Sequence, residues 1–310
     1  MAGFELRAMG ERDHAEVAEL ICASMNVWDI MHGNVPGRFS GGPAQCAVFP
    51  DVYERLDPGC CAVAEDTGTG RLLGSCFYRA RETHVSLGIM NVHPNHFGKG
   101  VAKALLEHVV GFQEREGKPL RLVSSVMNLE SFSLYTKYGF VPKLLYQDVV
   151  VHVPEEGLGL RPDRIEHVRD GTEEDAEALA ELELELNGIA RRKDYRFFAA
   201  NEDGTWSFSV IEGPGGRLDG YLASIGHPLF LEIGPGVARD EKAGAALLVR
   251  ELDRYRGRSP VFLVPVECSE LVGLAYRLGG RNVEMHAAQV RGASEPFRGV
   301  SFPTFMPETG

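Results

Sequence analysis

The first half of the chain alternates between short apolar segments and longer segments whose apolar residues recur every three or four positions. The short segments predict strands, and the longer ones predict amphipathic helices. Strands that alternate with helices in this way favour a mixed α/β sheet with helices on both faces. The expected strands are 4–8, 61–65, 73–79, 85–92, 120–126 and 141–151, and the expected helices are 15–21, 99–115 and 129–138.

The same order of elements returns after residue 158, which indicates an internal repeat. Arg7 and Asp13 stand between a predicted strand and a predicted helix. Arg169 and Asp175 have the same spacing at the same point of the second half. Repeated spacing at equivalent places predicts that one structural unit occurs twice.

A second repeated pattern lies near the end of each half. A Tyr-x-x-x-Gly segment closes a predicted helix at Tyr135 and again at Tyr276. The stretch 154–163 between the halves is rich in proline and glycine, which break regular structure. We therefore expect two copies of one βα domain. Their predicted extents are 1–153 for the first, 164–292 for the second and 293–310 for a C-terminal tail.

The composition is that of an ordinary globular protein, with 44% hydrophobic and 25% charged residues among 310. No apolar run approaches the ~20 residues that a membrane-spanning helix requires, so no membrane partner is expected. The start of the chain does not resemble a secretory signal, and the six cysteines form no C-x-x-C pair. We expect a cytoplasmic protein with reduced thiols, as a monomer or a homodimer.

The net charge is −12, and the basic residues form no stripe or tail. Proteins that bind nucleic acid usually concentrate lysine and arginine on one surface, so no nucleic-acid partner is expected. An acidic protein attracts cationic amines, but acidity also simply promotes solubility. The charge alone therefore does not identify a substrate.

The strand expected at 85–92 is followed by Pro94 and by a turn that opens the next helix at Gly98 and Gly100. Glycines leave the backbone N–H groups unscreened, and a helix N-terminus carries a partial positive charge. This arrangement suits a pyrophosphate, although a tight turn alone explains the glycines equally well. A P-loop is excluded because Gly100 follows Lys99, and the third glycine of a dinucleotide-binding motif is missing.

A second group of polar residues follows the strand expected at 120–126. Asn128 stands at the end of that strand, and Ser131 and Tyr135 follow on one face of the next helix. Gly139 is placed to end the helix. The alternative for Tyr135 is a core aromatic on an amphipathic helix.

Together these two segments resemble the GNAT superfamily of acyl-CoA-dependent N-acyltransferases. The residues that carry the resemblance are Val92-x-Pro94 followed by Gly98-x-Gly100, and Asn128 followed by Leu134-Tyr135-x-Lys137-x-Gly139-Phe140. The match covers about residues 4–150. It implies two tandem GNAT-like domains, each a mixed, mostly antiparallel sheet flanked by helices, with acetyl-CoA as the co-substrate.

The resemblance also implies roles for individual residues. Amides around His96–Ala102 would hold the pyrophosphate, and the strand edge at Met90–Val92 would pair with the pantetheine arm and polarise the thioester. Asn128 would hydrogen-bond the pantetheine, and Tyr135 would protonate the departing thiolate. The implied cofactor-binding residues are Met90, Asn91, Val92, Asn95, His96, Phe97, Gly98, Lys99, Gly100, Val101, Ala102, Asn128, Ser131 and Tyr135.

Two positions depart from the family pattern. Asn95 stands where the family usually has Gln or Arg, which implies weaker cofactor binding. Ser86 stands where many members carry a Glu that acts as general base. The base is therefore left open between His84, Glu82 and water. His84 lies on the same strand face as Ser86, and imidazole titrates near neutral pH.

The acceptor side is expected in the segment after the first helix. There Asp29 would hold an ammonium group, and Trp28 would pack beside it. A partly ordered loop over a core tryptophan is an equally good interpretation. His93 and His96 have no visible third ligand, so no metal site is expected.

The second copy has no recognisable cofactor site, because Asp240 and Glu241 place carboxylates where an anion would bind. It is similar to the degenerate halves of tandem GNAT proteins. We expect the first copy to transfer an acyl group, specifically acetyl, from CoA to a primary amine of a small molecule. A non-catalytic acyl-CoA-binding or regulatory module and a protein N-acetyltransferase remain as alternatives.

Overall fold

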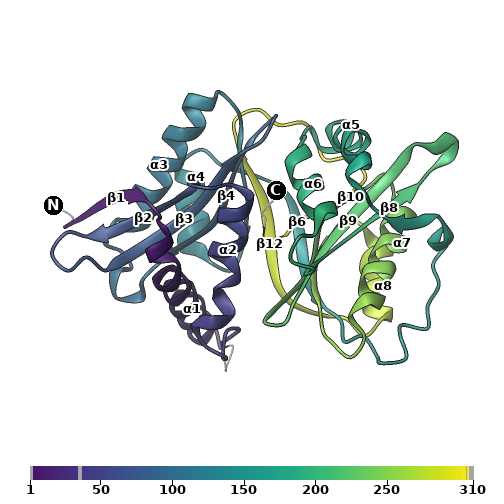
Figure 1. The fold of residues 1–310 in the computed structure, drawn as a ribbon, viewed down its shortest axis with the longest axis horizontal. Coiled ribbons are helices and arrows are strands. Elements are labelled where there is room, and N and C mark those ends of the chain that lie inside the picture. The colour runs from purple at the N-terminus through teal and green to yellow at the C-terminus, as the bar shows by residue number, and fades with distance from the viewer. Residues whose placement is uncertain (1–2, 34–36, 305, 307–310) are drawn as a thin grey trace. The chain divides into compact units, whose positions relative to one another are not determined.

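The computed structural model describes residues 3–33, 37–304 and 306 (Figure 1). These residues divide into two compact units. Unit 1 comprises 3–80 (with a gap at 34–36), 85–120 and 306, and unit 2 comprises 81–84 and 121–304. The domain boundaries expected from the repeat, at 153 and 164, remain a prediction. None of the described helices is long and apolar enough to cross a membrane.

Unit 1 is a four-stranded antiparallel sheet in which β1 to β4 pair in chain order. Phe77 and Tyr78 are consecutive in β3, so their side chains point to opposite faces. Phe77 stacks on Tyr53 of α2, and Tyr78 contacts His108 of α3, so these two helices cover opposite faces. The elements are β1 (Phe4–Ala8), α1 (His14–Met31), α2 (Val48–Leu56), β2 (Cys61–Asp66), β3 (Leu72–Ala80), β4 (Val85–Val92) and α3 (Val101–Glu116).

Unit 2 contains a larger mixed sheet with the strand order β5-β12-β6-β11-β10-β9-β8-β7, and β13 pairs with β10. Only the first residue of β5 belongs to unit 1. The helices are α4 (Leu129–Lys137), α5 (Ala176–Asn187), α6 (Arg192–Ala200), α7 (Glu241–Leu252) and α8 (Ser269–Arg277). The strands are β5 (Leu120–Ser125), β6 (Val141–Val150), β7 (Val168–Asp170), β8 (Trp206–Glu212), β9 (Leu218–His227), β10 (Phe230–Ala238), β11 (Val261–Pro265), β12 (Arg281–Arg291) and β13 (Val300–Phe302).

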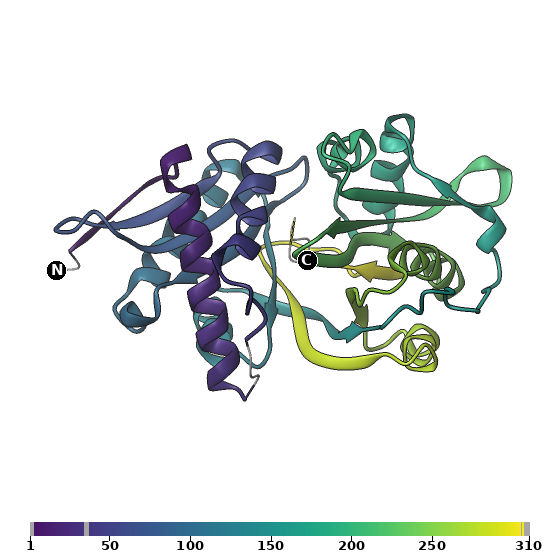
Figure 2. The same ribbon diagram turned by 60° about the horizontal axis from the view of Figure 1, so that its bottom comes forward.

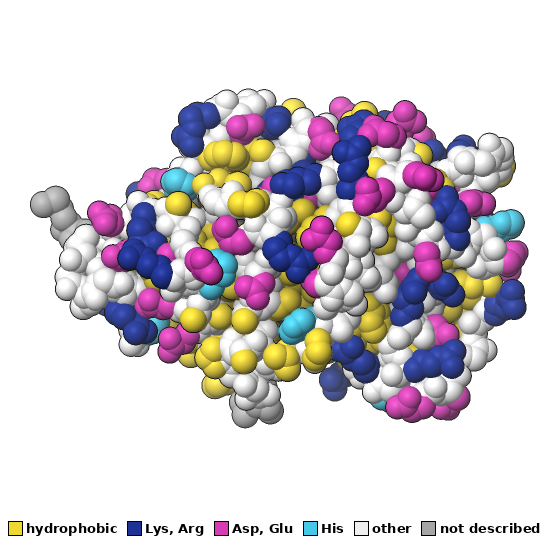
Figure 3. All heavy atoms as spheres, in the orientation of Figure 1, with side chains coloured by type: hydrophobic (Ala, Val, Ile, Leu, Met, Phe, Trp, Pro, Cys, Tyr) yellow, Lys and Arg dark blue, Asp and Glu magenta, His cyan; other side chains and the backbone are white. Residues whose placement is uncertain are grey.

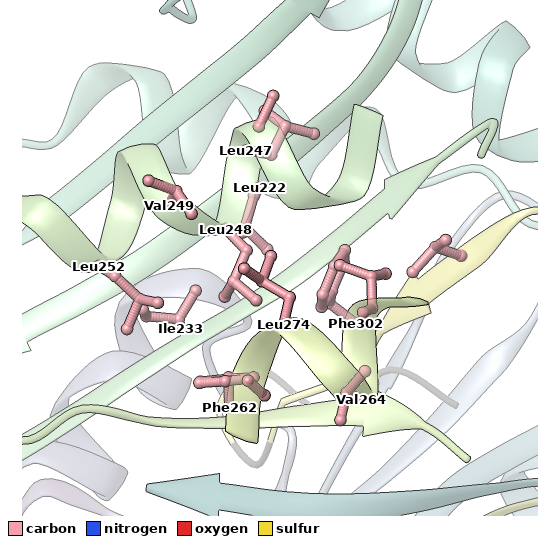
Figure 4. Close-up of a cluster of buried hydrophobic side chains, with 14 of the residues drawn as sticks. Leu222, Ile233, Leu247, Leu248, Val249, Leu252, Phe262, Val264, Leu274 and Phe302 are labelled. Atoms are coloured by element: carbon pink, nitrogen blue, oxygen red, sulfur yellow. The ribbon is translucent and has the colours of Figure 1, made fainter. Parts of the chain in front are cut away.

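The core of unit 2 lies between its sheet and the helices α7 and α8. Leu222, Leu247, Phe262 and Phe302 meet there, and each is fully buried (Figure 4). Burying one side chain of this size stabilises a fold by about 1.5–3 kcal/mol. The apolar positions that recur along α7 are thus explained by their contact with the sheet.

The last strand of each copy is paired with strands of the other copy. β6 follows α4 of the first copy, yet it pairs antiparallel with β11 and β12 of the second. β12 in turn lies beside β5, where Val126 N donates to Met285 O at 3.0 Å and Gln289 Nε2 donates to Ser124 Oγ at 2.7 Å. The exchanged strand β12 is the long yellow strand of Figures 1 and 2.

The two copies repeat the same ion pair at their first turn. The Arg7 side chain donates to Asp13 at 2.6 Å, and Arg169 donates to Asp175 at 2.8 Å. In both copies the aspartate also accepts a backbone N–H from the residue three positions earlier, at 2.8 Å. The repeated spacing in the sequence therefore corresponds to a repeated structure.

A close approach of helix to sheet requires glycine at the same place in both copies. A Cβ on Gly74 of β3 would lie 2.7 Å from Val101 of α3. A Cβ on Gly220 of β9 would lie 2.9 Å from Leu247 of α7. From two residues after each glycine, at Cys76 of β3 and Leu222 of β9, the register with β4 and with β10 shifts, which is the mark of a β-bulge.

Some elements differ from the expectations. β10 continues through Gly234 and Pro235 to Ala238, because pairing with β9 resumes after these two residues, which suggest a turn when read locally. Helix α6 and strand β13 were not expected. β13 lies in the expected tail, and a strand of three residues that pairs with a distant partner leaves no local pattern.

The charges and thiols complete the description. On the face seen in Figure 3, lysine and arginine are interspersed with aspartate and glutamate, so the described residues form no continuous basic stripe there. The six cysteines are free thiols, and all but Cys60 are buried.

Candidate active site

The turn between β4 and α3 exposes backbone N–H groups at a helix N-terminus. Gly98 and Gly100 have φ angles of +74° and +87°, in the left-handed region that favours glycine. No described heavy atom lies within 4 Å of a Cβ placed on either of them. Gly100 is the N-cap of α3 and has no side chain, so within the described part of the chain no N-cap side chain binds the N–H groups of Val101, Ala102 and Lys103. These groups and the helix dipole form a site for an anion such as a pyrophosphate.

The residues before the glycines shape the rim of this site. Pro94–His96 is a single 3-10 turn, in which Asn95 N donates to His93 Nδ1 at 3.2 Å. Lys99 is exposed, and Phe97 is 48% exposed, which is unusual for a large apolar side chain. The turn therefore presents a cation and an aromatic ring beside the anion site.

Met90–Val92 form the end of β4, the last strand of unit 1. Asn91 is paired with Ser75 of β3 and donates a side-chain hydrogen bond to Ser24 of α1. The side-chain oxygens Ser75 Oγ, Ser86 Oγ and Asn91 Oδ1 are buried and have no hydrogen-bond partner among the described residues. Such atoms are normally satisfied by bound water. The face of β4 toward α1 thus has unmet hydrogen-bonding capacity, including at the position of the missing carboxylate.

The structure places Asn128, Ser131 and Tyr135 at the start and along one side of α4 in unit 2. Asn128 Oδ1 accepts a hydrogen bond from Ser131 N at 3.1 Å and so caps the helix. The cap uses the side-chain oxygen, and the Nδ2 group remains as the donor of this side chain. Tyr135 is 6% exposed, and its ring centroid lies 5.6 Å from that of Phe140.

The two side chains expected as candidate bases have other roles in the loop between β3 and β4. His84 is 1% exposed, with Nδ1 at 3.1 Å from Thr83 Oγ1. The Glu82 carboxylate accepts a hydrogen bond from the backbone N of Arg192 at 3.1 Å, and it forms an ion pair with the Arg192 side chain at 3.5 Å. Thr83 also accepts from Ala190 N at 2.9 Å. This loop is therefore hydrogen-bonded to the segment that connects α5 and α6.

The pair expected at the acceptor side is also engaged within unit 1. Asp29 is 2% exposed and accepts from Arg38 N at 2.9 Å and from the Arg38 side chain at 3.0 Å. Its charge is therefore compensated, and an incoming ammonium group would have to displace Arg38. Trp28 stacks on His32 with ring centroids 4.2 Å apart. The assignment of Trp28 and Asp29 to the acceptor side stays a prediction.

The equivalent turn of the second copy is closed by its own carboxylates. Asp240 is the N-cap of α7, and its Oδ1 accepts from Ala243 N at 2.8 Å. Glu241 accepts from Leu271 N of α8 at 2.9 Å. The helix N-terminus that could attract an anion thus already faces two negative side chains.

The strand edge of the second copy is also occupied. Gly220 pairs with Ala238 as Gly74 pairs with Val92, so Gly236–Ala238 is the counterpart of Met90–Val92. β13 pairs antiparallel with these three residues, and its Phe302 is fully buried. The chain's own strand therefore lies where a pantetheine arm would pair in this copy.

Sequence reasoning missed one cluster of ionisable side chains. His286 on β12 lies between Asp148 of β6, with Nδ1 to Oδ1 at 2.9 Å, and Glu284 of β12, with Nε2 to Oε1 at 4.0 Å. Their exposures are 6%, 2% and 9%. The available signal was a charged or imidazole side chain inside an otherwise apolar strand, and no motif marks it.

Comparisons with known proteins agree with this geometry. Residues 57–142 match the family profile described as acetyltransferase (GNAT) domain. A putative acetyltransferase from Pyrococcus horikoshii is 16% identical with a TM-score of 0.71, and 94% of this chain covers 90% of that one. A GCN5-related N-acetyltransferase from Sphaerobacter thermophilus is 17% identical with a TM-score of 0.63, over 95% and 97% of the two chains.

A tandem GNAT protein from the clavulanic acid biosynthesis pathway is 15% identical with a TM-score of 0.60, over 94% of this chain and all (100%) of that one. A stretch of 71 residues is 32% identical to the UPF0157 protein YqkA of Bacillus subtilis (strain 168), over 23% of this chain. That stretch spans only 20% of the curated relative.

The chain therefore has the fold of tandem GNAT proteins, and residues 57–142 match an acetyltransferase (GNAT) domain. The expected fold class, two domains built on mostly antiparallel strands flanked by helices, is confirmed.

Proposed function

We propose that this protein transfers the acetyl group of acetyl-CoA to the primary amine of a small molecule, and that the first copy holds the cofactor. The observation that carries this proposal is the uncapped N-terminus of α3 behind two left-handed glycines, Gly98 and Gly100. The second copy has its own carboxylates and its own strand at the corresponding places.

The proposed reaction is a direct transfer. The pyrophosphate binds the N–H groups from Gly98 to Ala102, the pantetheine runs along Met90–Val92, and Asn128 donates to it through Nδ2. The amine nitrogen attacks the thioester carbonyl carbon, a C–N bond forms, and the C–S bond breaks. The amine loses a proton to a base, and Tyr135 gives a proton to the CoA thiolate.

Calorimetric titration of acetyl-CoA into wild type and a Gly98→Glu variant tests the site. The new carboxylate faces the bound anion and the residue is strained at positive φ, so affinity should fall at least tenfold, or about 1.4 kcal/mol. Gly117→Glu is the matched control. Gly117 ends the same helix at φ +65° with no described atom within 4 Å of a Cβ, so the strain is similar but the anion site is untouched. Equal affinities of both variants and wild type would refute the assignment.

A second candidate function is a non-catalytic acyl-CoA-binding module. Ser86 favours it, because this position lacks the carboxylate that usually serves as base in the family. This candidate predicts binding of acetyl-CoA without amine-dependent release of CoA thiol. Thiol release across a panel of primary amines (spermidine, tyramine, an aminoglycoside and a lysine-containing peptide) distinguishes the two.

A further inference from the structure

Two buried oxygen acceptors lie side by side at the end of β4. Asn91 and Ser75 are directly opposite each other in the β3–β4 register, so their side chains share one face of the sheet, with Cβ atoms about 4.5–5.5 Å apart. Asn91 donates to Ser24 of α1, so this face is the one toward α1. Asn91 and Ser75 are 7% and 0% exposed, and Asn91 Oδ1 and Ser75 Oγ have no hydrogen-bond partner among the described residues.

Helix α1 carries a donor in the same condition. Trp28 follows Ser24 by four positions, so the two side chains lie on the same side of the helix. The Trp28 ring stacks on His32, and its Nε1 is buried without a hydrogen-bond partner in the described part of the chain. α1 therefore offers an N–H donor on the side from which Ser24 contacts Asn91.

The charged groups around this face are engaged elsewhere. The described carboxylates of α1 and α2 are each held by another group of unit 1, namely Glu16 and Glu19 by Arg71, Asp29 by Arg38, Asp51 by His14, and Glu54 by the backbone N of Gly59. Burial raises the pKa of the thiols Cys22, Cys46 and Cys61, so they stay neutral. A buried cation, Arg79 of β3, lies opposite Ser86 and over the Tyr53 ring. The groups with unmet hydrogen-bonding capacity beside Asn91 are therefore uncharged.

Uncharged acceptors suit an uncharged amine. A neutral primary amine has two N–H donors and one lone pair. A carboxylate in contact with it would favour the ammonium form, which has no lone pair with which to attack. An amide oxygen and a hydroxyl oxygen accept the two N–H groups without this effect. Met90 and Val92, which flank Asn91, are half-buried and belong to the strand edge at which the proposed reaction places the thioester.

We infer that Asn91 Oδ1 and Ser75 Oγ accept the two N–H groups of the acceptor amine, and that Trp28 Nε1 donates to an oxygen next to it. The acceptor is then a weakly basic primary amine with a neighbouring hydroxyl group, as in an amino sugar or an amino alcohol. This inference rests on the proposed acetyl transfer.

The reaction follows from the neutral form of the amine. The amine displaces the water that normally satisfies such buried atoms. Its lone pair forms the C–N bond, and the C–S bond breaks. The nitrogen releases one proton to water, and Tyr135 protonates the thiolate. A site that selects the neutral amine needs no carboxylate, which accounts for Ser86 at the position where the family often has one.

The test compares wild type with Asn91→Leu, Ser75→Ala and Asn91→Asp. Asn187→Leu is the matched control, because Asn187 of α5 in unit 2 is 1% exposed and its Oδ1 also has no hydrogen-bond partner among the described residues. The assay follows thiol release with acetyl-CoA and glucosamine, tyramine or spermidine, from pH 6 to 10. Calorimetry with acetyl-CoA and the thermal unfolding midpoint are measured for each variant.

Wild type should have a kcat/KM at pH 7 for glucosamine at least about tenfold above that for spermidine, because a smaller fraction of a strongly basic amine is neutral. The kcat/KM for each amine should rise with pH up to that amine's own pKa. Asn91→Leu should raise the KM for glucosamine about tenfold, and Ser75→Ala by a smaller factor, with acetyl-CoA affinity unchanged.

Asn91→Asp has the same shape as wild type and separates recognition from packing. Its carboxylate favours the ammonium form, so the preference should shift toward spermidine and the acid limb for glucosamine should move to higher pH. Asn187→Leu should leave the KM for every amine unchanged, whatever its unfolding midpoint.

Three results would overturn the inference. An unchanged KM for glucosamine in Asn91→Leu and Ser75→Ala would mean that these atoms only bind water. An acid limb at one pH for all three amines would point to a titrating base of the protein instead of the neutral amine. Binding of acetyl-CoA by wild type without thiol release to any amine would overturn the proposed transfer itself, which distinguishes that failure from the first two.

Discussion

The two strand-to-helix turns of this protein have the same frame and opposite chemistry. β4 pairs with β3, and β10 pairs with β9, and each pair contains a β-bulge. In each pair the partner strand carries a glycine, Gly74 or Gly220, that lies against the helix α3 or α7. Residues 93–100 then join β4 to α3, whereas only residues 239–240 join β10 to α7. The longer turn ends in open glycines, and the shorter one ends in a capping aspartate. The fold is thus common to both copies, and the capacity to bind an anion depends on a few residues of the turn.

The strand edges that precede the two turns, Met90–Val92 of β4 and Gly236–Ala238 of β10, also differ. In the second copy β13 supplies the backbone hydrogen bonds of Gly236–Ala238 and buries Phe302 between α7 and the sheet. The strand edge that corresponds to Met90–Val92 is thus part of the core in the second copy. A strand of the chain itself can therefore occupy the place where the proposal puts a ligand in the first copy.

The largest effect is expected from Phe302→Ala, which breaks this filling. Removal of a buried phenylalanine costs about 3–5 kcal/mol and leaves a cavity. Urea unfolding followed by fluorescence measures the loss. Acetyl-CoA affinity should stay that of wild type wherever the variant is folded. A gain of a second acetyl-CoA per chain would show that β13 masks an intact site.

The next effect concerns the two tyrosines that the repeat aligns. Tyr135→Phe should lower kcat by about 10²-fold, because the proposed acid is removed while the ring still packs. Tyr276 is 47% exposed and donates to Gln147 at 2.6 Å, so Tyr276→Phe should leave kcat unchanged. Steady-state thiol release measures both. Equal rates in the two variants would remove Tyr135 from the mechanism.

A smaller effect is expected at the cap of α7. Asp240→Ala removes the hydrogen bond to Ala243 N and should destabilise the protein by about 1 kcal/mol. It should not create a second cofactor site, because β13 still covers the strand edge. Thermal unfolding and acetyl-CoA titration of the same sample report both results, and a second binding event would contradict the role given to β13.

The smallest effect concerns the ion pair that the copies share. Hydrogen bonding to Arg7 lowers the pKa of Asp13. Burial acts to raise the pKa of Asp175, but hydrogen bonding to Arg169 acts in the other direction, and the net result is a lowered pKa. A carboxyl with a depressed folded pKa contributes stability above its ordinary pKa, and this is lost as pH falls through the folded pKa. Asp13→Asn and Asp175→Asn should each be less stable than wild type at pH 6 and less different from it at pH 3. Urea unfolding at both pH values measures this, and a constant difference would contradict it.

The parts that were predictable from the sequence are those whose signal is local. Gly98 and Gly100, and Asn128 with Tyr135, lie within short segments, so their spacing alone places them at a helix start and along a helix face. The repeat was also visible, because Arg7 and Asp13 recur at the same spacing.

The parts that were not predictable depend on distant partners. Asp148 and His286 are 138 positions apart, and only the strand exchange brings them together. The sequence alone favoured Asp29 as a partner for an ammonium group, because nothing in the local pattern indicates that Arg38, nine positions further on, binds it. β13 is similar, since its three residues become a strand only against β10.

The strand exchange has a consequence for how the chain is made. β6 is complete at Val150, but its partners begin only at Val261 and Arg281. Both edges of β6 therefore stay unpaired during synthesis until the residues of β11 and β12 have been added to the chain. Such long-range pairing raises the contact order and slows folding, and unpaired strand edges promote aggregation. A cut between the two copies, within residues 154–163, would therefore leave β6 without the strands β11 and β12 that pair with it.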